Sequence, residues 1–198
     1  MLPERSRNRR VVSAPIIHRS FAAQHAFNRE VWARLINDRT LSDVLEKLET
    51  DRDGNLLMSP PPKKPHLLRQ DRINQLLKQQ LPEGGSLVED TVSTPEGVKR
   101  PDVAWYGAPS ATALENDPDE VLSTVTPDLC VEVLSPGNTA REIRDKTAAY
   151  FAAGVREVWI CDRDGKMSFY GPPGFLERSA ICPDFPREIP PTFLRQPI

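Results

Sequence analysis

The chain has few cysteines and no long apolar run. Its 198 residues include three cysteines, and no two of them form a C-x-x-C pair. These features argue against a disulfide framework or a cysteine zinc cluster and fit a reducing compartment. No stretch reaches the ~18 apolar residues that a membrane-spanning helix needs, and the arginine-bearing N-terminus has no apolar signal segment. The sequence therefore predicts a cytoplasmic protein with no membrane partner.

Several common catalytic signatures are also missing. The chain contains no H-E-x-x-H, no Walker loop, no G-x-S-x-G elbow and no dinucleotide-binding fingerprint. Its three histidines, His18, His25 and His66, do not have metal-ligand spacing. We expect His66 to lie near the site only because it begins a predicted helix. Hydrolases with a serine or cysteine nucleophile have the least support.

Hydrophobic residues make up only 38% of the chain, which contains 20 prolines. This composition predicts a modest core surrounded by long irregular segments. At this length we expect an N-terminal extension with one helix over residues 1–40 and one domain over 41–198 that ends in a Pro-rich tail. The net charge of −2 argues against a protein that coats DNA without regard to sequence. Charge is unevenly distributed, with five acids and no base in 115–128, which permits an acidic site but is equally typical of solvated faces.

Apolar periodicity predicts an α/β protein. Helices are expected at 20–38, 41–49, 65–81 and 139–153, and strands at 55–58, 87–93, 102–106, 129–134, 157–162 and 167–170. The connection from strand 129–134 through helix 139–153 to strand 157–162 implies a parallel pair. The expected architecture is a mixed central sheet flanked by helices.

Two carboxylates in this pattern are candidates for a metal site. Glu132 stands in an otherwise apolar strand, where an unpaired carboxylate would cost several kcal/mol. A buried pair with an arginine is the alternative interpretation. Asp102 follows Pro101 at the start of a strand, although Pro-Asp also opens turns. Carboxylates brought together repel unless a hard cation such as Mg²⁺ joins them, and the backbone carbonyl of Val133 could supply a further oxygen ligand.

Lys146 is the candidate cationic residue. It lies three residues after Ile143 and so borders the buried side of its predicted helix. From there its ammonium could reach the strand that carries Glu132 and orient a water or stabilise phosphate charge. A surface ion pair with Glu142, four residues earlier, is an equally good interpretation.

Several short segments, in order along the chain, carry a family resemblance. They are Leu48-Glu49, Asp53-Gly54, Met58-Ser59-Pro60, Arg100-Pro101-Asp102, Val131-Glu132-Val133-Leu134-Ser135-Pro136, Lys146 with Tyr150, Gly154-Val155, Trp159 and Asp162. From about residue 41 to 170 the chain resembles the Uma-two family of restriction-type endonucleases, within the PD-(D/E)XK nuclease superfamily.

The resemblance implies a restriction endonuclease-like core that cuts DNA phosphodiester bonds with Mg²⁺, or with Mn²⁺ in its place. Asp102 and Glu132 would bind the metal, and Glu49 would be a third acid from the first predicted helix of the domain. Leu134 occupies the position where the superfamily usually has its lysine. In the Uma-two pattern the catalytic lysine lies on the following helix, at Lys146.

Two functions therefore stay open. The retained acids favour a metal-dependent DNA endonuclease. The near-neutral charge and the missing strand lysine favour a nuclease-like fold that serves as a non-catalytic binding or assembly module. A double-strand break generally needs two active sites, which favours a homodimer, with the helix around Trp32 as the candidate contact surface.

Overall fold

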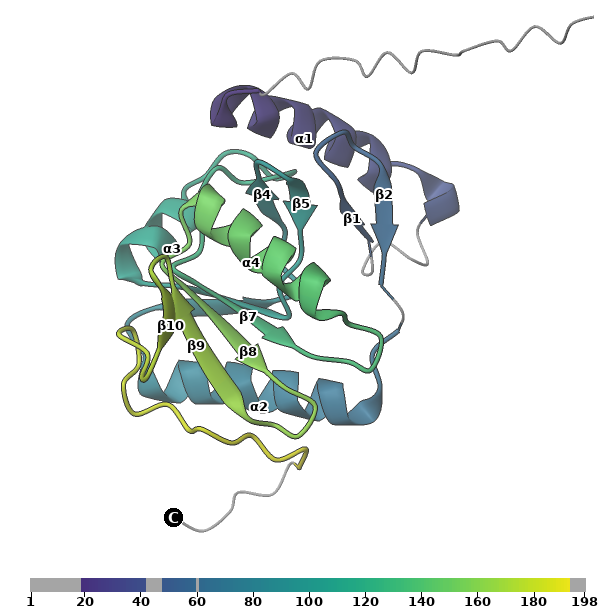
Figure 1. The fold of residues 1–198 in the computed structure, drawn as a ribbon. Helices are drawn as coiled ribbons and strands as arrows, with labels where there is room; N and C mark the ends of the chain where they lie inside the picture. Colours follow the sequence, from purple (N-terminus) through teal and green to yellow (C-terminus); the bar gives the residue numbers. More distant parts are fainter. Residues whose placement is uncertain (1–18, 42–47, 60, 193–198) are drawn as a thin grey trace, which may run out of the picture.

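The structure, a computed structural model, describes residues 19–41, 48–59 and 61–192. A six-stranded sheet with the strand order β10-β9-β8-β7-β6-β3 forms the centre, and two small hairpins, β1-β2 and β4-β5, lie beside it (Figure 1). The helices are α1 (Phe21–Ile36), the 3₁₀ helix η1 (Arg39–Leu41), α2 (Lys64–Gln80), α3 (Ala108–Glu115) and α4 (Ala140–Ala153). The sheet strands are β3 (Gly85–Val88), β6 (Val103–Tyr106), β7 (Leu129–Val133), β8 (Glu157–Cys161), β9 (Met167–Gly171) and β10 (Gly174–Leu176). The hairpin strands are β1 (Leu48–Thr50), β2 (Leu56–Met58), β4 (Val92–Thr94) and β5 (Gly97–Lys99).

Helices α2 and α4 cover opposite faces of the sheet (Figure 1). Successive side chains of a strand point to opposite faces, so β7 sends alternate residues to each helix. Leu129, Val131 and Val133 join the core that includes α2, whereas Cys130 packs in the cluster with Tyr150 of α4. By the same alternation Glu132 faces α4.

The strand directions follow the prediction. β7 pairs in parallel with β8, and the register places Glu132 opposite Ile160. β6 pairs antiparallel with β7, so the sheet is mixed. The start of β6, just after Asp102, therefore lies beside the end of β7.

The first turn of α4 explains why Glu142 does not pair with Lys146. Thr139 is the N-cap, and its Oγ1 accepts from the N–H of Glu142 at 3.2 Å. The carboxylate of Glu142 accepts in turn from the N–H of Thr139, which completes a capping box. At the other end, Gly154 adopts φ 103°, the left-handed conformation that ends many helices.

Two local predictions were wrong. The end of the predicted helix 41–49 is instead strand β1, with Leu48 opposite Met58 of β2, while residues 42–47 lie outside the described part. The predicted strand 87–93 is two strands, because Glu89 takes φ 53° and interrupts the extended backbone. Sequence patterns also missed β5, α3 and β10.

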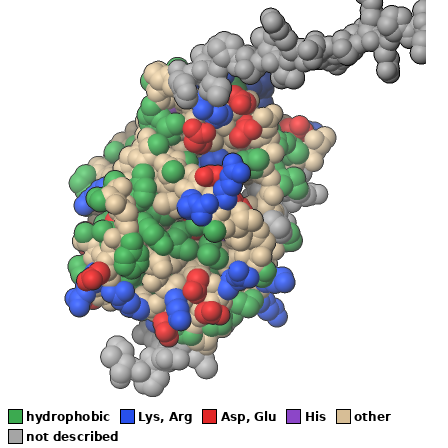
Figure 2. Space-filling view, viewed as in Figure 1, with side chains coloured by type: hydrophobic (Ala, Val, Ile, Leu, Met, Phe, Trp, Pro, Cys, Tyr) green, Lys and Arg blue, Asp and Glu red, His purple; other side chains and the backbone are tan. Residues whose placement is uncertain are grey.

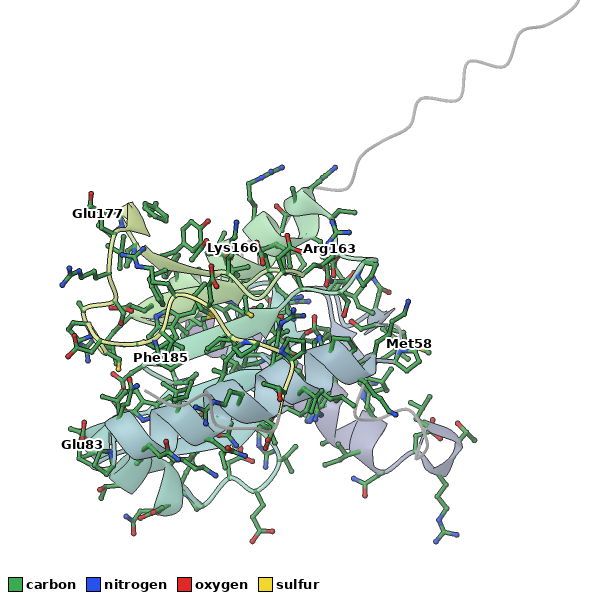
Figure 3. All side chains as sticks on the ribbon, turned by 90° about the horizontal axis from the view of Figure 1, so that it is seen from below. Met58, Glu83, Arg163, Lys166, Glu177 and Phe185 are labelled. Atoms are coloured by element: carbon green, nitrogen blue, oxygen red, sulfur yellow. The ribbon has the colours of Figure 1, made fainter. Side chains whose placement is uncertain are left out.

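Both ends of the described chain pack on the domain. Trp32 of α1, the helix of the expected homodimer contact, is only 3% exposed and packs with Leu48 and Val98. Phe185, in the segment after β10, lies 4.5 Å from the ring of Trp159, centroid to centroid. Figure 3 shows this segment beside α2. The homodimer itself stays a prediction.

The surface and the cysteines agree with a well-formed core. Cys130, Cys161 and Cys182 are all free and buried. The face in Figure 2 mixes Lys and Arg with Asp and Glu side chains among apolar ones. None of the helices in the described part is both long and apolar enough to cross a bilayer.

Candidate functional site

A large open cleft, with a volume of about 1700 Å³, brings the predicted site residues together. Its walls come from the β1-β2 hairpin, α2, α4 and the adjoining ends of β6 and β7. The cleft is lined by Glu49, Asp102, Glu132, Val133 and Lys146. Residues separated by almost a hundred positions in sequence therefore share one space.

Glu132 is the most buried acid of the cleft, at 7% exposure. Its Oε1 and Oε2 lie 2.8 and 2.9 Å from Nζ of Lys146, and Tyr150 donates its hydroxyl to Oε1 at 2.6 Å. The partner is thus a lysine on α4, and the alternative of a buried arginine pair is wrong. Burial raises the pKa of Glu132 to about 7. The positive charge of Lys146 lowers this pKa, but the negative charges of Asp102 and Glu49 partly offset that effect.

Lys146 stands between two carboxylates. Its Nζ is 2.8 Å from Oε1 of Glu49 as well as from Glu132, and it donates to the carbonyl of Arg100 at 3.3 Å. Burial lowers the pKa of Lys146, but the two glutamates more than offset this and leave the pKa above its ordinary value. The side chain is therefore a positively charged donor that has no lone pair to accept a proton.

Glu49 reaches the site from a strand. It lies on β1 and not on a helix as predicted, and its Oε1 also accepts the backbone N–H of Arg100 at 3.0 Å. Glu49 thus lies in the cleft with the other two acids, but on a strand instead of the predicted helix. Alternation on a short strand points Glu49 away from its buried neighbours Leu48 and Thr50.

Asp102 lies just before β6 and both of its oxygens have partners. Oδ2 accepts the backbone N–H of Val133 at 2.5 Å, and Oδ1 is 3.0 Å from Nε2 of His66. The other ring nitrogen of His66 lies 3.2 Å from Oγ of Ser135. Burial lowers the pKa of His66, but the hydrogen bond to Asp102 and the nearby acids raise it above the ordinary value. His66 is therefore a direct partner of the site and not only a neighbour.

Two further residues were missed by sequence reasoning. Gln70 of α2 donates to Oε1 of Glu89 at 3.0 Å and to the carbonyl of Asp102 at 2.9 Å. Burial, followed by the charge of Asp102, raises the pKa of Glu89. No motif or spacing identifies them, because the contact depends on the left-handed backbone of Glu89 and on how α2 packs.

The carboxylates of the cleft suit a hard cation, although their oxygens already contact other groups of the protein. Carboxylate oxygens are the ligands that Mg²⁺ prefers, and one or two of them suffice when water completes the shell. In the part of the chain that the structure describes, no three His, Cys, Asp or Glu side chains converge as a metal cluster. The oxygens of Asp102 and Glu132 instead contact Val133, His66, Lys146 and Tyr150.

Comparison with known families now decides the classification. The family model described as "Uma2: Putative restriction endonuclease" matches residues 40–190. The chain belongs to the Uma2 family. Membership confirms the predicted resemblance, while the roles of individual residues stay predictions.

A solved structure shows the same fold. It is described as "a putative nuclease belonging to DUF820 from Anabaena variabilis ATCC 29413", and it matches with a TM-score of 0.55 and 18% sequence identity. The match covers 63% of this chain and 72% of the other. At this identity the likeness concerns the fold, and it confirms the mixed α/β nuclease-like architecture. No match was found among curated proteins.

Proposed function

We propose that this Uma2 protein is a divalent-metal-dependent endonuclease that hydrolyses phosphodiester bonds in DNA. The observation that carries the proposal is that Glu49 and Glu132, from separate strands, both pair with Lys146 in an open cleft that Asp102 also lines. Burial raises the pKa of Glu132, and the charges of Asp102 and Glu49 add to the increase. Buried carboxylates with a raised pKa in a cleft are typical of functional sites.

Metal dependence is supported by the charge of the cleft. Nine Asp or Glu residues line it against five Lys or Arg residues. A DNA backbone would be repelled by this surface unless cations neutralise part of the charge. Asp102 and Glu132 would hold the ion. The carbonyl of Val133 would assist, because the N–H and C=O of one strand residue point to the same side and the N–H of Val133 points at Asp102.

The bound ion would supply charge neutralisation at the scissile phosphate and a more acidic water. The chain's own residues do the rest. Lys146 keeps its charge and donates hydrogen bonds to the attacking water or to a phosphate oxygen. His66, held by Ser135, fixes the orientation of Asp102, while Tyr150 and Lys146 fix Glu132.

A binding or assembly module is the second candidate. It is favoured by the saturation of Asp102 and Glu132 with contacts inside the protein and by Leu134 at the usual lysine position. The two functions differ in turnover, so a cleavage assay separates them.

The deciding experiment incubates supercoiled plasmid with purified protein in Mg²⁺, Mn²⁺ or EDTA. We expect cutting only with metal, and a fall in rate of about 10²–10³-fold or more in Asp102→Asn and Glu132→Gln, because each removes charge at the reacting centre. Glu177→Gln, an exposed acid labelled in Figure 3, is the matched control and keeps the wild-type rate.

Cutting that survives both site substitutions, or that proceeds in EDTA, contradicts the proposal. A wild-type protein that binds duplex DNA without cutting it supports the binding module. Melting with added Mn²⁺ gives an independent readout, since a ligand that binds only the folded state raises the melting temperature. We expect this increase in wild type and in Glu177→Gln but not in Glu132→Gln.

A further inference from the structure

Arg100 is held by the site through its backbone, while its side chain has no hydrogen-bond partner among the described residues. Its N–H donates to Glu49 at 3.0 Å, and its carbonyl accepts from Lys146 at 3.3 Å. Across residues 19–41, 48–59 and 61–192, its guanidinium makes no hydrogen bond or ion pair, and its Nε is buried with no acceptor. Arg100 nevertheless lines the acidic cleft.

This arrangement is unfavourable in the protein as it stands. A guanidinium is always charged, and a buried N–H without an acceptor is energetically costly. The backbone contacts keep the residue at the site, two positions before Asp102. An acceptor that enters the cleft and takes the Nε–H together with one Nη–H would remove this cost.

The other cations that line the cleft are mostly occupied. Lys146 is shared by two glutamates, and Lys99 donates to the carbonyl of Thr50 at 2.8 Å. Arg141 pairs with Asp145 on the exposed surface of α4. Among the described residues, Arg100 is therefore a half-buried cation of the cleft whose side-chain donors stay free for a ligand.

We propose that Arg100 binds a backbone phosphate of the nucleic acid beside the carboxylate cluster, through a forked contact from Nε and one Nη. The inference rests on the proposed function and names the residue that positions its substrate. A planar fork of two parallel N–H groups matches two phosphate oxygens. A contact to phosphate, unlike one to a guanine edge, acts on every DNA sequence alike.

The test compares Arg100→Gln and Arg100→Lys with Arg163→Gln, an exposed arginine on the β8–β9 turn that is labelled in Figure 3. Binding of short duplexes, with and without guanine, is measured by fluorescence anisotropy in Ca²⁺ over a range of salt concentrations. We expect Arg100→Gln to weaken binding about 10–100-fold on every duplex, as the loss of a charged hydrogen-bonding pair does. The slope of log affinity against log salt should fall by about one.

Arg100→Lys should keep the wild-type salt slope, because it keeps the charge, but should lose affinity, because it has no fork. Arg163→Gln should bind as wild type does. Unchanged binding in Arg100→Gln overturns the proposal and leaves the nuclease function standing. A loss confined to guanine-containing duplexes also overturns it. Circular dichroism verifies folding. If Arg100→Gln does not fold, the affinity and salt slope of Arg100→Lys are compared with those of wild type instead.

A second arm keeps the two proposals distinguishable if the wild type neither binds nor cuts DNA. Inorganic phosphate, at an ionic strength matched with chloride, is added during thermal melting. A rise in melting temperature in wild type that is absent in Arg100→Gln supports the phosphate site without any nuclease activity. An equal rise in both proteins, or none in either, overturns it.

Discussion

Two buried glutamates on adjacent parallel strands, Glu132 of β7 and Glu157 of β8, have different surroundings. They are 7% and 3% exposed. Glu157 accepts from four neutral donors at 2.6–3.0 Å: Trp159 Nε1, Ser179 Oγ and the backbone N–H groups of Ala180 and Ile181. Glu132 accepts from a charged lysine and a tyrosine and lies near two further acids.

The difference separates a structural carboxylate from a candidate catalytic one. The donors of Glu157 fix the segment around residues 179–181 to the sheet, and no ligand is needed to complete its contacts. Glu132 is buried beside Asp102 and Glu49. Burial raises its pKa first, these two acids raise it further, and the charge of Lys146 does not fully offset them. Burial of a carboxylate is therefore a weak sign of function, whereas burial together with other acids is a strong one.

The largest expected effect is on stability, from Glu157→Ala. The substitution leaves the indole N–H of Trp159, the hydroxyl of Ser179 and two backbone N–H groups without their acceptor. We expect the free energy of unfolding to fall by about 4 kcal/mol, measured by urea denaturation. Glu157→Gln, which keeps the shape and one acceptor, should lose about half as much.

The folded fraction of Glu157→Gln should cut DNA at the wild-type rate, because Glu157 lies outside the cleft lining. If Glu157→Ala were as stable as wild type, the four hydrogen bonds would contribute little to the free energy of unfolding. A variant that folds but no longer cuts would remove the contrast between the two glutamates.

A smaller effect concerns pH and Glu132. Its pKa of about 7 in the folded protein exceeds the ordinary 4.5, so the folded state holds this proton more tightly than the unfolded state. The stability that the proton contributes is present below 4.5 and is lost as pH rises to about 7, above which it stays constant. The change is on the order of 3 kcal/mol, since one unit of pKa corresponds to about 1.4 kcal/mol.

The measurement is the difference in unfolding free energy between wild type and Glu132→Gln, determined at several pH values. As pH rises from 4.5 to about 7, we expect the unfolding free energy of wild type to fall relative to that of Glu132→Gln. His66 and Glu89 titrate in both proteins and largely cancel. A difference that is flat with pH, or that moves in favour of wild type, would show that Lys146 neutralises Glu132 completely.

The smallest expected effect comes from Tyr150→Phe, which removes the hydroxyl that donates to Glu132 and keeps the buried ring. We expect a loss of about 1 kcal/mol in the free energy of unfolding, typical of one hydrogen bond. Tyr170→Phe, on the more open β9, is the matched control and should change stability less. Equal losses would mean that the hydrogen bond to Glu132 adds nothing beyond packing.

Much of the fold could be read from local patterns. The helix predicted at 139–153 is α4, Ala140–Ala153, with Thr139 before it and Gly154 after it. This helix and the parallel pair of strands around it were predicted nearly to the residue. Helical periodicity and capping residues are local signals, so they survive without tertiary information. The predictions failed at Glu49 and Glu89, where a three-residue hairpin strand and a left-handed residue are too short to leave a period.

The candidate site was predicted in part. Asp102 and Glu132 were identified because an acid beside or within an apolar strand is costly, and Lys146 because its position borders a buried helix face. His66, Gln70 and Glu89 lie close to Asp102 only because α2 packs across the sheet. Glu157 looked unremarkable because its donors come from a segment with no regular pattern.

The sequence by itself determined the order of the elements, the alternation that turns Glu132 toward α4, and membership of the Uma2 family. These follow from near-neighbour periodicity and from short spaced motifs. Only the tertiary structure decided that Lys146 binds two acids instead of Glu142, that Asp102 contacts His66, and that the guanidinium of Arg100 makes no hydrogen bond or ion pair within the described part of the chain. A partner depends on which atoms are close in space and on whether water can reach them, and neither quantity is a property of the linear chain.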